Sequence, residues 1–164
     1  MNRREFLSMG AAAGALSAGV VLGVNRPAPA LAQDFEVTKT AAEWRAVLSD
    51  AQYGVLREED TERPGSSPLL HEKRKGTFHC AGCDLAVYPS DTKYESGTGW
   101  PSFWDSLPGA IGAKEDRSLF MARTECHCRR CGGHFGHIFN DGPQPTGLRH
   151  CLNGLALKFK PATA

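Results

Sequence analysis

The chain has 164 residues, of which 23% are charged and 41% are hydrophobic, and its formal net charge at pH 7 is +1. This length allows one modest domain, and the interspersed acidic and basic residues provide neither a basic stripe for phosphate contacts nor an acidic tail. We therefore exclude nucleic acid as an expected partner.

The N-terminal segment resembles an export signal. A twin arginine near the start precedes an apolar stretch rich in Ala and Gly, which ends in an A-x-A pattern formed by Ala30 and Ala32. We predict a twin-arginine (Tat) signal peptide over residues 1–32 and a mature domain over residues 33–164, located in the periplasm or otherwise outside the cytoplasm. An uncleaved membrane anchor is the alternative, because the apolar run is nearly long enough to span a bilayer.

Two short helices are expected at the start of the mature domain. Thr40 and Glu43 form a capping-box pattern, which should begin the first helix. Ser49 and Gln52 repeat the pattern before a second apolar stretch. The charged run that follows, residues 57–60, indicates a solvated helix end and loop rather than a binding site.

Beyond residue 67, short apolar segments alternate with Gly and Pro, and this spacing favours a β-rich body. The strand-like segments lie at residues 77–79, 85–88, 118–123 and 155–159. The sequence after residue 57 contains no long amphipathic helical pattern and no glycine-rich phosphate loop of the P-loop or dinucleotide-binding kind.

Four of the six cysteines form two C-x-x-C pairs, Cys80 with Cys83 and Cys128 with Cys131. Two such turns can supply the four thiolates of a closed tetrahedral zinc site, which would be structural because no coordination position stays open. Two disulfides are the alternative in an exported chain. A Tat substrate is exported already folded, so its thiolates could bind zinc in the reducing cytoplasm first. We predict one structural zinc ion.

Cys151 is the candidate nucleophile among the remaining cysteines. It lies in a strand-like segment beside Arg149 and His150, two basic side chains that would favour a thiolate. A buried structural cysteine is the competing interpretation. Upstream, His134 and His137 stand three residues apart among glycines and aromatic residues, where they could bind a metal or supply protons to a reactive cysteine.

Taken in order, these segments resemble the type B methionine sulfoxide reductase family. The matching motifs are S-G-x-G-W-P-S-F, R-T-E before the second C-x-x-C pair, G-H-x-G-H-x-F-x-D-G-P, P-T-G-L-R and C-x-N. They cover the chain from about Trp44 to Phe159. The resemblance implies a mainly β fold of two antiparallel sheets, a β-tent, with short N-terminal helices and a structural zinc held by the paired cysteines.

The same resemblance implies the activity and the roles of the site residues. The polar residues that it assigns to catalysis are Cys151, His134, His137 and Asn153. Trp100 would be the apolar wall for the substrate's S-methyl group, and Arg149 would help to hold Cys151 as a thiolate. The substrate would be methionine-R-sulfoxide in oxidised peptides or proteins, and a thioredoxin-like or other thiol would be the reductant. We expect the protein to be a monomer.

The chemistry requires a soft thiolate and an acid, because a sulfoxide sulfur is electrophilic and its oxygen leaves only when it is protonated. Cys151 would attack that sulfur while His134 or His137, directly or through a water, protonates the oxygen. Methionine would then depart and leave Cys151 as a sulfenic acid. A site that fixes methyl group, oxygen and side chain together accepts one epimer of the chiral sulfoxide.

The sequence departs from a common family pattern at Thr98, where many members carry the cysteine that resolves the sulfenic acid. Cys126 is the only cysteine left for this role, but it could equally be a small core residue or an alternative metal ligand. Direct reduction by an external thiol is then the main alternative. His150, Phe135 and Gly154 replace the tyrosine, leucine and serine often found there, which affects details of substrate contact.

Two functions of other classes compete with this interpretation. A non-catalytic zinc-ribbon module would explain both C-x-x-C pairs but would leave Cys151, the histidine pair and the Gly-Trp-Pro loop without a role. A thiol–disulfide oxidoreductase would use one C-x-x-C pair as a redox couple, although the second pair and the lack of a βαβ pattern disfavour it. Zinc content and sulfoxide turnover would separate the three.

Overall fold

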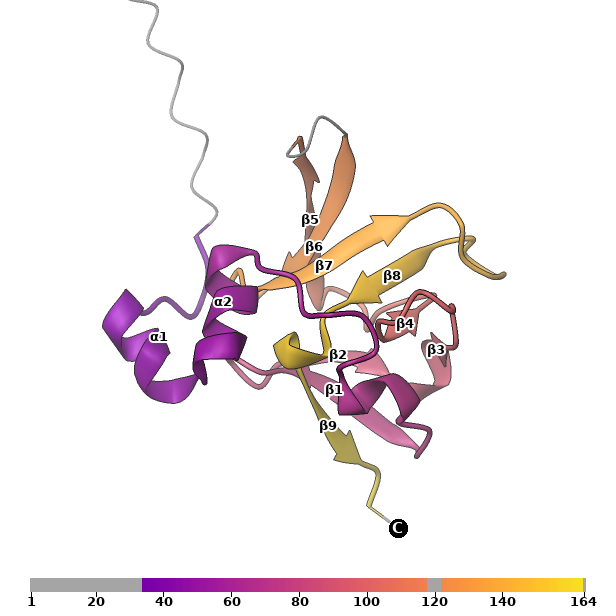
Figure 1. Cartoon of the computed structure of the whole chain (residues 1–164), viewed down its shortest axis with the longest axis horizontal. Coiled ribbons are helices and arrows are strands. Elements are labelled where there is room, and N and C mark those ends of the chain that lie inside the picture. Colours follow the sequence, from indigo (N-terminus) through magenta and orange to yellow (C-terminus); the bar gives the residue numbers. More distant parts are fainter. Residues whose placement is uncertain (1–33, 118–121, 164) are drawn as a thin grey trace, which may run out of the picture. The chain divides into compact units, whose positions relative to one another are not determined.

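The computed structural model describes residues 34–117 and 122–163 (Figure 1). The predicted signal peptide at residues 1–32 lies outside these residues, as does most of the predicted strand at 118–123. A search of the described residues finds no helix with the length and apolar character that crossing a membrane requires.

The two N-terminal helices, α1 (Ala41–Val47) and α2 (Asp50–Glu58), begin at the predicted capping boxes. In both boxes the hydroxyl of the cap residue accepts a hydrogen bond from the third helical residue, whose own side chain accepts one from the cap backbone. Glu59, the C-cap residue that follows α2, adopts the left-handed conformation with φ of 61°. The two predicted helices are therefore confirmed.

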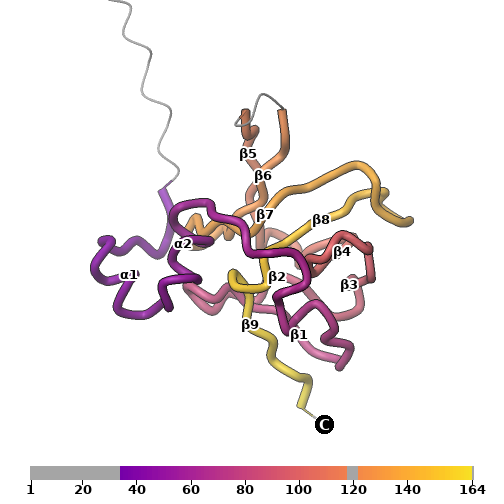
Figure 2. The backbone as a smooth tube through the Cα atoms, viewed as in Figure 1, coloured from indigo at the N-terminus to yellow at the C-terminus, as the bar shows by residue number. Residues whose placement is uncertain are grey.

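The strands form two antiparallel sheets, as predicted. The three-stranded sheet has the order β2-β1-β9 and comprises β1 (Gly76–Cys80), β2 (Ala86–Pro89) and β9 (Leu157–Pro161). The six-stranded sheet has the order β3-β4-β8-β7-β6-β5 (Figures 1 and 2). Its strands are β3 (Lys93–Tyr94), β4 (Ser102–Phe103), β5 (Ile111–Asp116), β6 (Arg123–Cys128), β7 (His134–Phe139) and β8 (Arg149–Leu152).

The predicted strand at residues 155–159 begins later than expected. The chain first makes a short 3-10 turn, η4 (Gly154–Ala156), and β9 starts at Leu157. The carboxylate of Glu62 accepts hydrogen bonds from the first two backbone N–H groups of this turn. A distant side chain thus caps the turn, and local sequence contains no signal for that contact.

Aromatic side chains join the two sheets. Phe78 of β1 and Tyr88 of β2 both contact Phe103 of β4, with ring centroids 5.0 Å and 4.6 Å apart. All three side chains are completely buried, together with Phe135 and Leu152 of the large sheet. This core covers one face of the six-stranded sheet and leaves its other face to the polar residues described next.

Candidate active site and metal centre

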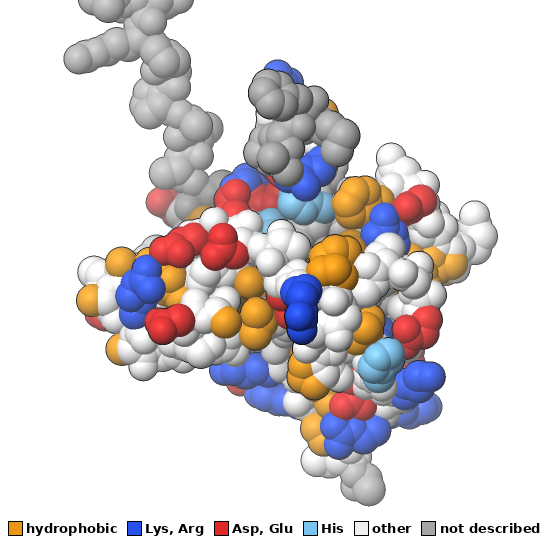
Figure 3. Space-filling view, in the orientation of Figure 1, with side chains coloured by type: hydrophobic (Ala, Val, Ile, Leu, Met, Phe, Trp, Pro, Cys, Tyr) orange, Lys and Arg blue, Asp and Glu red, His pale blue; other side chains and the backbone are white. Residues whose placement is uncertain are grey.

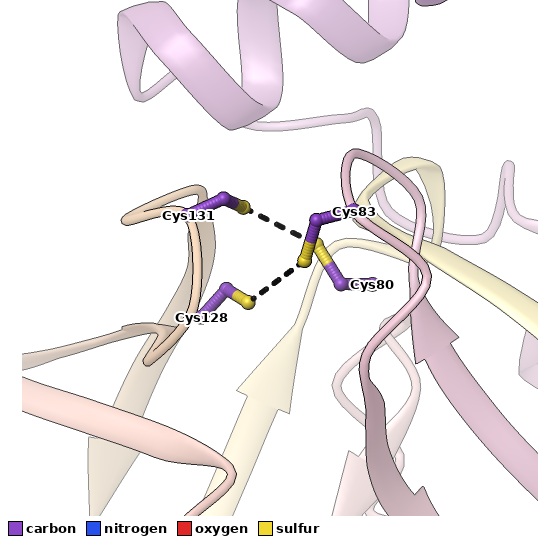
Figure 4. A group of neighbouring side chains, drawn as sticks. All are labelled: Cys80, Cys83, Cys128 and Cys131. Atoms are coloured by element: carbon purple, nitrogen blue, oxygen red, sulfur yellow. Dashed lines mark hydrogen bonds between the residues drawn. The ribbon is translucent and has the colours of Figure 1, made fainter. Parts of the chain in front are cut away.

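Four cysteines converge from the two sheets (Figure 4). Cys80 and Cys83 come from the end of β1 and the turn after it, and Cys128 and Cys131 come from the end of β6 and its following turn. Their Sγ atoms all lie within 4.8 Å of one another. Within the cluster Cys80 Sγ is 3.7 Å from Cys131 Sγ, and Cys83 Sγ is 3.5 Å from Cys128 Sγ.

These distances fit a tetrahedral zinc site and are longer than an S–S bond. Four thiolates about 2.3 Å from one zinc ion would stand about 3.8 Å apart, close to the observed separations. All six cysteines of the chain are free thiols in the structure. Hydrogen bonds among the four thiols lower the pKa of Cys83 and of Cys128 and raise the pKa of Cys80 and of Cys131, so the case for zinc rests on the sulfur geometry. One structural zinc would join the small sheet to the large one.

Helix α2 and the segment before α1 support the metal-binding turns. Arg57 donates a hydrogen bond of 2.9 Å from its Nη1 to the carbonyl oxygen of Cys131. Before α1, the backbone N–H of Val37 donates to the carbonyl of Arg130, and the ring of Phe35 covers Gly132. The charged run at residues 57–60 is therefore more than a solvated helix end, because its first residue holds one of the zinc turns.

Cys151 opens into a separate pocket on the face of the six-stranded sheet away from the aromatic core. On β8 it stands directly opposite His137 of β7 and Ser102 of β4. Because residues directly opposite each other in a sheet point to the same side, His137 and Cys151 face each other across one row. The pocket has a volume of about 150 Å³, and the residues that line it are Thr61, Trp100, Arg123, Gly136, His137, Phe139, Cys151, Leu152 and Asn153.

Gly136 allows the strands to approach closely at this point. A Cβ atom at position 136 would overlap the carbonyl oxygen of Cys151. The absence of a side chain therefore lets β7 and β8 stay together beside Cys151. In the space-filling view, histidine side chains meet acidic, basic and apolar side chains next to the β5–β6 hairpin (Figure 3).

The two histidines have different positions. His137 lines the pocket, and its Nε2 lies 2.8 Å from Oδ2 of Asp116. His134 is 4% exposed and does not line the pocket; its Nδ1 lies 2.8 Å from Oε1 of Glu125. The two rings contact each other edge to face, with centroids 5.5 Å apart. The structure thus places His137 beside Cys151 and His134 behind it.

Burial and carboxylates oppose each other at both histidines. Desolvation lowers the pKa of His134 and of His137, and at His137 the hydrogen bond that Asp116 accepts offsets only part of this lowering. Cations neutralise both carboxylates: Arg123 Nη2 lies 2.7 Å from Asp116 Oδ2, and a lysine on β5 lies 2.8 Å from the Glu125 carboxylate. Each histidine is therefore held by an ion-paired carboxylate that can stabilise its protonated form.

Trp100 and Asn153 form another wall of the pocket. The indole Nε1 of Trp100 donates a hydrogen bond of 3.0 Å to the carbonyl oxygen of Glu62. The amide of Asn153 accepts a bond of 2.9 Å from the backbone N–H of Glu62 and donates one of 3.0 Å to the carbonyl of Phe135. Both side chains are fixed by hydrogen bonds to the backbone rather than free to rotate.

Arg149 lies on the same face of β8 as Cys151, two residues away. Its guanidinium makes two hydrogen bonds to Asp141, of 2.8 and 2.9 Å, and stacks over the ring of Phe139 at 4.3 Å. Hydrogen bonding to Asp141 raises the pKa of Arg149. Asp141 thus holds the fork of the guanidinium, and the role of Arg149 in keeping Cys151 a thiolate stays a prediction.

Thr98 lies next to Cys151, with its Oγ1 3.8 Å from Cys151 Sγ. Cys126 instead faces the aromatic core, where it lies 3.3 Å from the hydroxyl of Tyr88. The same hydroxyl lies 3.0 Å from Nδ1 of His150, which also points away from the pocket. Burial raises the pKa of Cys126 to about 12.

The proposed resolving role of Cys126 conflicts with this arrangement. Strand β7 separates Cys126 on β6 from Cys151 on β8, so their backbones stand about two strand spacings, or about 9.5 Å, apart. Their side chains also point to opposite faces of the sheet, whereas a disulfide requires Cα atoms within about 7 Å. Cys126 is also outside the metal cluster. The small-core-residue interpretation fits its surroundings.

Several residues of the site had no assigned role in the sequence analysis. These residues are Thr61, Glu62, Asp116, Arg123 and Glu125. The R-T-E motif contains Arg123 and Glu125, which alternate along β6 and so point to the same face of the sheet as His137. The motif could therefore have indicated that both residues belong to the site. Asp116 had no comparable signal, since only the pairing of β5 with β6 brings it to His137.

Comparisons with known proteins agree with this geometry. The family model described as the SelR domain matches residues 48–161. A protein of Methanosarcina barkeri named peptide methionine sulfoxide reductase MsrB is 52% identical over 125 residues, which cover 76% of this chain and 88% of the relative. Proteins with the same name from Agrobacterium fabrum and Leptospira interrogans are each 47% identical, and the matches cover 77% of this chain and 94% and 98% of the relatives.

Proposed function

The chain belongs to the SelR-domain family that includes the MsrB peptide methionine sulfoxide reductases, and from that premise we propose that it reduces methionine-R-sulfoxide in peptides and proteins. The observation that carries the proposal is the pairing of Cys151 with His137 across one row of the sheet, in a pocket that Trp100 and Asn153 line. A zinc-ribbon module without activity would not need this pocket.

Cys151 is the nucleophile in this proposal. Its thiolate attacks the sulfoxide sulfur, and His137 delivers a proton to the sulfoxide oxygen. The oxygen is transferred to Cys151, which becomes a sulfenic acid, and the substrate sulfur is reduced to that of methionine. His137 acts directly because it lines the pocket, whereas His134 supports it from behind.

The walls of the pocket select the epimer. Trp100 provides an apolar surface for the S-methyl group, while His137 and Asn153 face the oxygen side. Exchange of oxygen and methyl group, as in the S epimer, would place the polar oxygen against the indole. A single arrangement therefore lets the thiolate reach sulfur while the acid reaches oxygen.

An external thiol reduces the sulfenic acid in this proposal. A first thiol forms a mixed disulfide with Cys151 and releases water, and a second thiol then frees Cys151. Thr98 supports this route because it cannot form a disulfide, and Cys126 supports it because it faces the core. A thioredoxin-like protein or a small thiol has the required chemistry.

Zinc has a structural role here. The four cysteine thiolates would complete its coordination and cross-link the two sheets, so the metal would supply stability rather than a catalytic step. The catalytic pocket uses the side chains of Cys151 and His137 instead.

Turnover of the two separate epimers of a methionine sulfoxide peptide tests the function. Zinc-loaded protein with dithiothreitol should reduce only the R epimer, and Cys151→Ser should abolish this turnover. Cys126→Ser is the matched control and should retain it. If folded, zinc-loaded protein reduces neither epimer, the zinc-module interpretation is favoured instead.

We also propose that residues 1–32 export the folded enzyme by the Tat pathway and that the mature protein acts as a monomer. The twin arginine, Arg3 and Arg4, and the A-x-A pattern support export. Changing both arginines to lysine should retain the protein in the cytoplasm; unchanged export would reject the Tat assignment. Sedimentation of the mature protein at several concentrations tests the monomer.

A further inference from the structure

Glu62 lies in the segment that follows α2, and it is a buried acidic residue, 7% exposed, outside the pocket lining. Its backbone groups bond to two residues that line the pocket, and its carboxylate bonds to the turn η4 after Asn153. Its backbone N–H donates to Asn153 Oδ1 at 2.9 Å, and its carbonyl oxygen accepts from Trp100 Nε1 at 3.0 Å. Its carboxylate accepts from the backbone N–H groups of Gly154 at 2.5 Å and Leu155 at 3.2 Å.

These four bonds connect three segments that the sequence separates widely. The loop carrying Glu62 is joined to the loop carrying Trp100 and to the end of β8 with its following turn. The residue before it, Thr61, lines the pocket itself. One side chain and its backbone therefore fix the distance between the indole wall and the strand that carries Cys151.

We infer that Glu62 is the positioning residue that sets the width of the substrate pocket by holding Trp100 at a fixed distance from Asn153. The inference rests on the proposed reductase function. It adds that the preference for a methyl group on the sulfoxide sulfur depends on a residue that does not touch the substrate. The feature that carries it is a set of four hydrogen bonds from one buried residue: the two backbone bonds reach Trp100 and Asn153, and the two carboxylate bonds hold the turn that follows Asn153.

The carboxylate is suited to this position because both of its partners are donors. Glutamine offers one oxygen and an amide group, and the amide hydrogens would face a backbone N–H group. Aspartate is shorter by one methylene and would not reach both N–H groups of η4. The turn η4 has little room to shift, because Gly154 packs closely against Ser67. A Cβ atom at position 154 would overlap Ser67 Oγ. Glu62→Gln should therefore loosen the turn after Asn153.

A wider pocket should weaken discrimination by alkyl size. The kcat/KM for methionine-R-sulfoxide peptide, divided by that for the ethionine analogue, measures this discrimination, and one methylene in an apolar pocket is worth about 10–200-fold. We expect Glu62→Gln to lower the ratio about tenfold, mainly through a higher KM for the methionine substrate. The rate at which iodoacetamide alkylates Cys151 should stay unchanged, because the nucleophile and His137 keep their places.

Zinc-loaded full-length protein, compared with Glu62→Gln and the control Glu58→Gln, provides the test. Glu58 is an exposed residue at the end of α2 that pairs with Arg45, so its variant should behave as the wild type. Zinc content and thermal unfolding show whether each variant is folded. If Glu62→Gln does not fold, Glu62→Asp, which keeps the charge, is measured in the same way.

A folded Glu62 variant with undiminished discrimination between methyl and ethyl sulfoxides would overturn the inference while leaving the reductase function intact. Wild-type protein without sulfoxide turnover would instead refute the proposed function. In ¹H–¹⁵N spectra, the indole N–H signal of Trp100, assigned with Trp100→Phe, should exchange faster with solvent in Glu62→Gln than in the wild type. Equal protection in both proteins would also contradict the positioning role.

Discussion

Replacing Thr98 by cysteine should convert the enzyme from one that leaves a sulfenic acid to one that forms an internal disulfide. Thr98 Oγ1 is 3.8 Å from Cys151 Sγ, so a thiol at position 98 would lie within reach of the oxidised nucleophile. The two positions are 53 residues apart. Closing a loop of that length removes about 4 kcal/mol of unfolded-state entropy at 25 °C. For a domain of this size the melting temperature should rise on the order of 10 °C after oxidation.

Intact mass after reaction with substrate, without added thiol, measures the outcome. The wild type should gain one oxygen and react with dimedone, whereas Thr98→Cys should lose two hydrogens and resist dimedone. Addition of dithiothreitol should then lower the melting temperature of the oxidised variant only. Cys126→Ser, introduced into both proteins, is the control and should change neither result. Persistent sulfenic acid in Thr98→Cys would refute the placement of position 98 beside Cys151.

The remaining predictions concern stability. Cys83→Ser or removal of zinc by a chelator should unfold the domain. Binding of a structural zinc ion contributes about 10–16 kcal/mol, whereas the whole free energy of unfolding of a domain is about 5–15 kcal/mol. A cooperative thermal transition of the metal-free protein would contradict this prediction. Burial lowers the pKa of His134, His137 and His150 below the ordinary 6.5. As the pH falls, the unfolded chain therefore takes up protons at these histidines before the folded protein does. The free energy of unfolding should consequently decrease as the pH drops below 6.5. Urea titrations of zinc-saturated protein should show a smaller decrease for His150→Phe, and an equal decrease would argue against that histidine. Gly112→Ala should cost about 1–3 kcal/mol, because its Cβ would overlap the His127 ring, and calorimetry should detect the loss.

Local chemistry explains what could be predicted from the sequence. Each capping box lies within four residues, so Thr40 and Ser49 indicate helix starts without knowledge of the fold. The C-x-x-C spacing likewise fixes the shape of each metal turn, and two turns suffice for a tetrahedral site. The motifs around Cys151 identified the family because their order, rather than any single fragment, is specific.

The contacts that could not be predicted are those that depend on strand register. Whether Cys126 faces Cys151 or the core is decided by its place on β6, and a shift of one residue would reverse its direction. Asp116 reaches His137 only because β5 pairs with β6. Glu62 and Asn153 are 91 residues apart and meet through packing of a loop against the end of β8.

The fold assigns different chemistry to cysteines that are alike in sequence. Four sulfurs stand close enough to share one metal ion. The metal would keep these thiols deprotonated, but as its ligands they would not be available to attack a substrate. Cys126 is completely buried, and burial keeps it protonated by raising its pKa to about 12. Cys151 alone lines the pocket beside a histidine. In the proposed reaction, oxidation by a sulfoxide would thereby be confined to one thiol, and an external thiol would reach that same sulfur through the opening that admits the substrate.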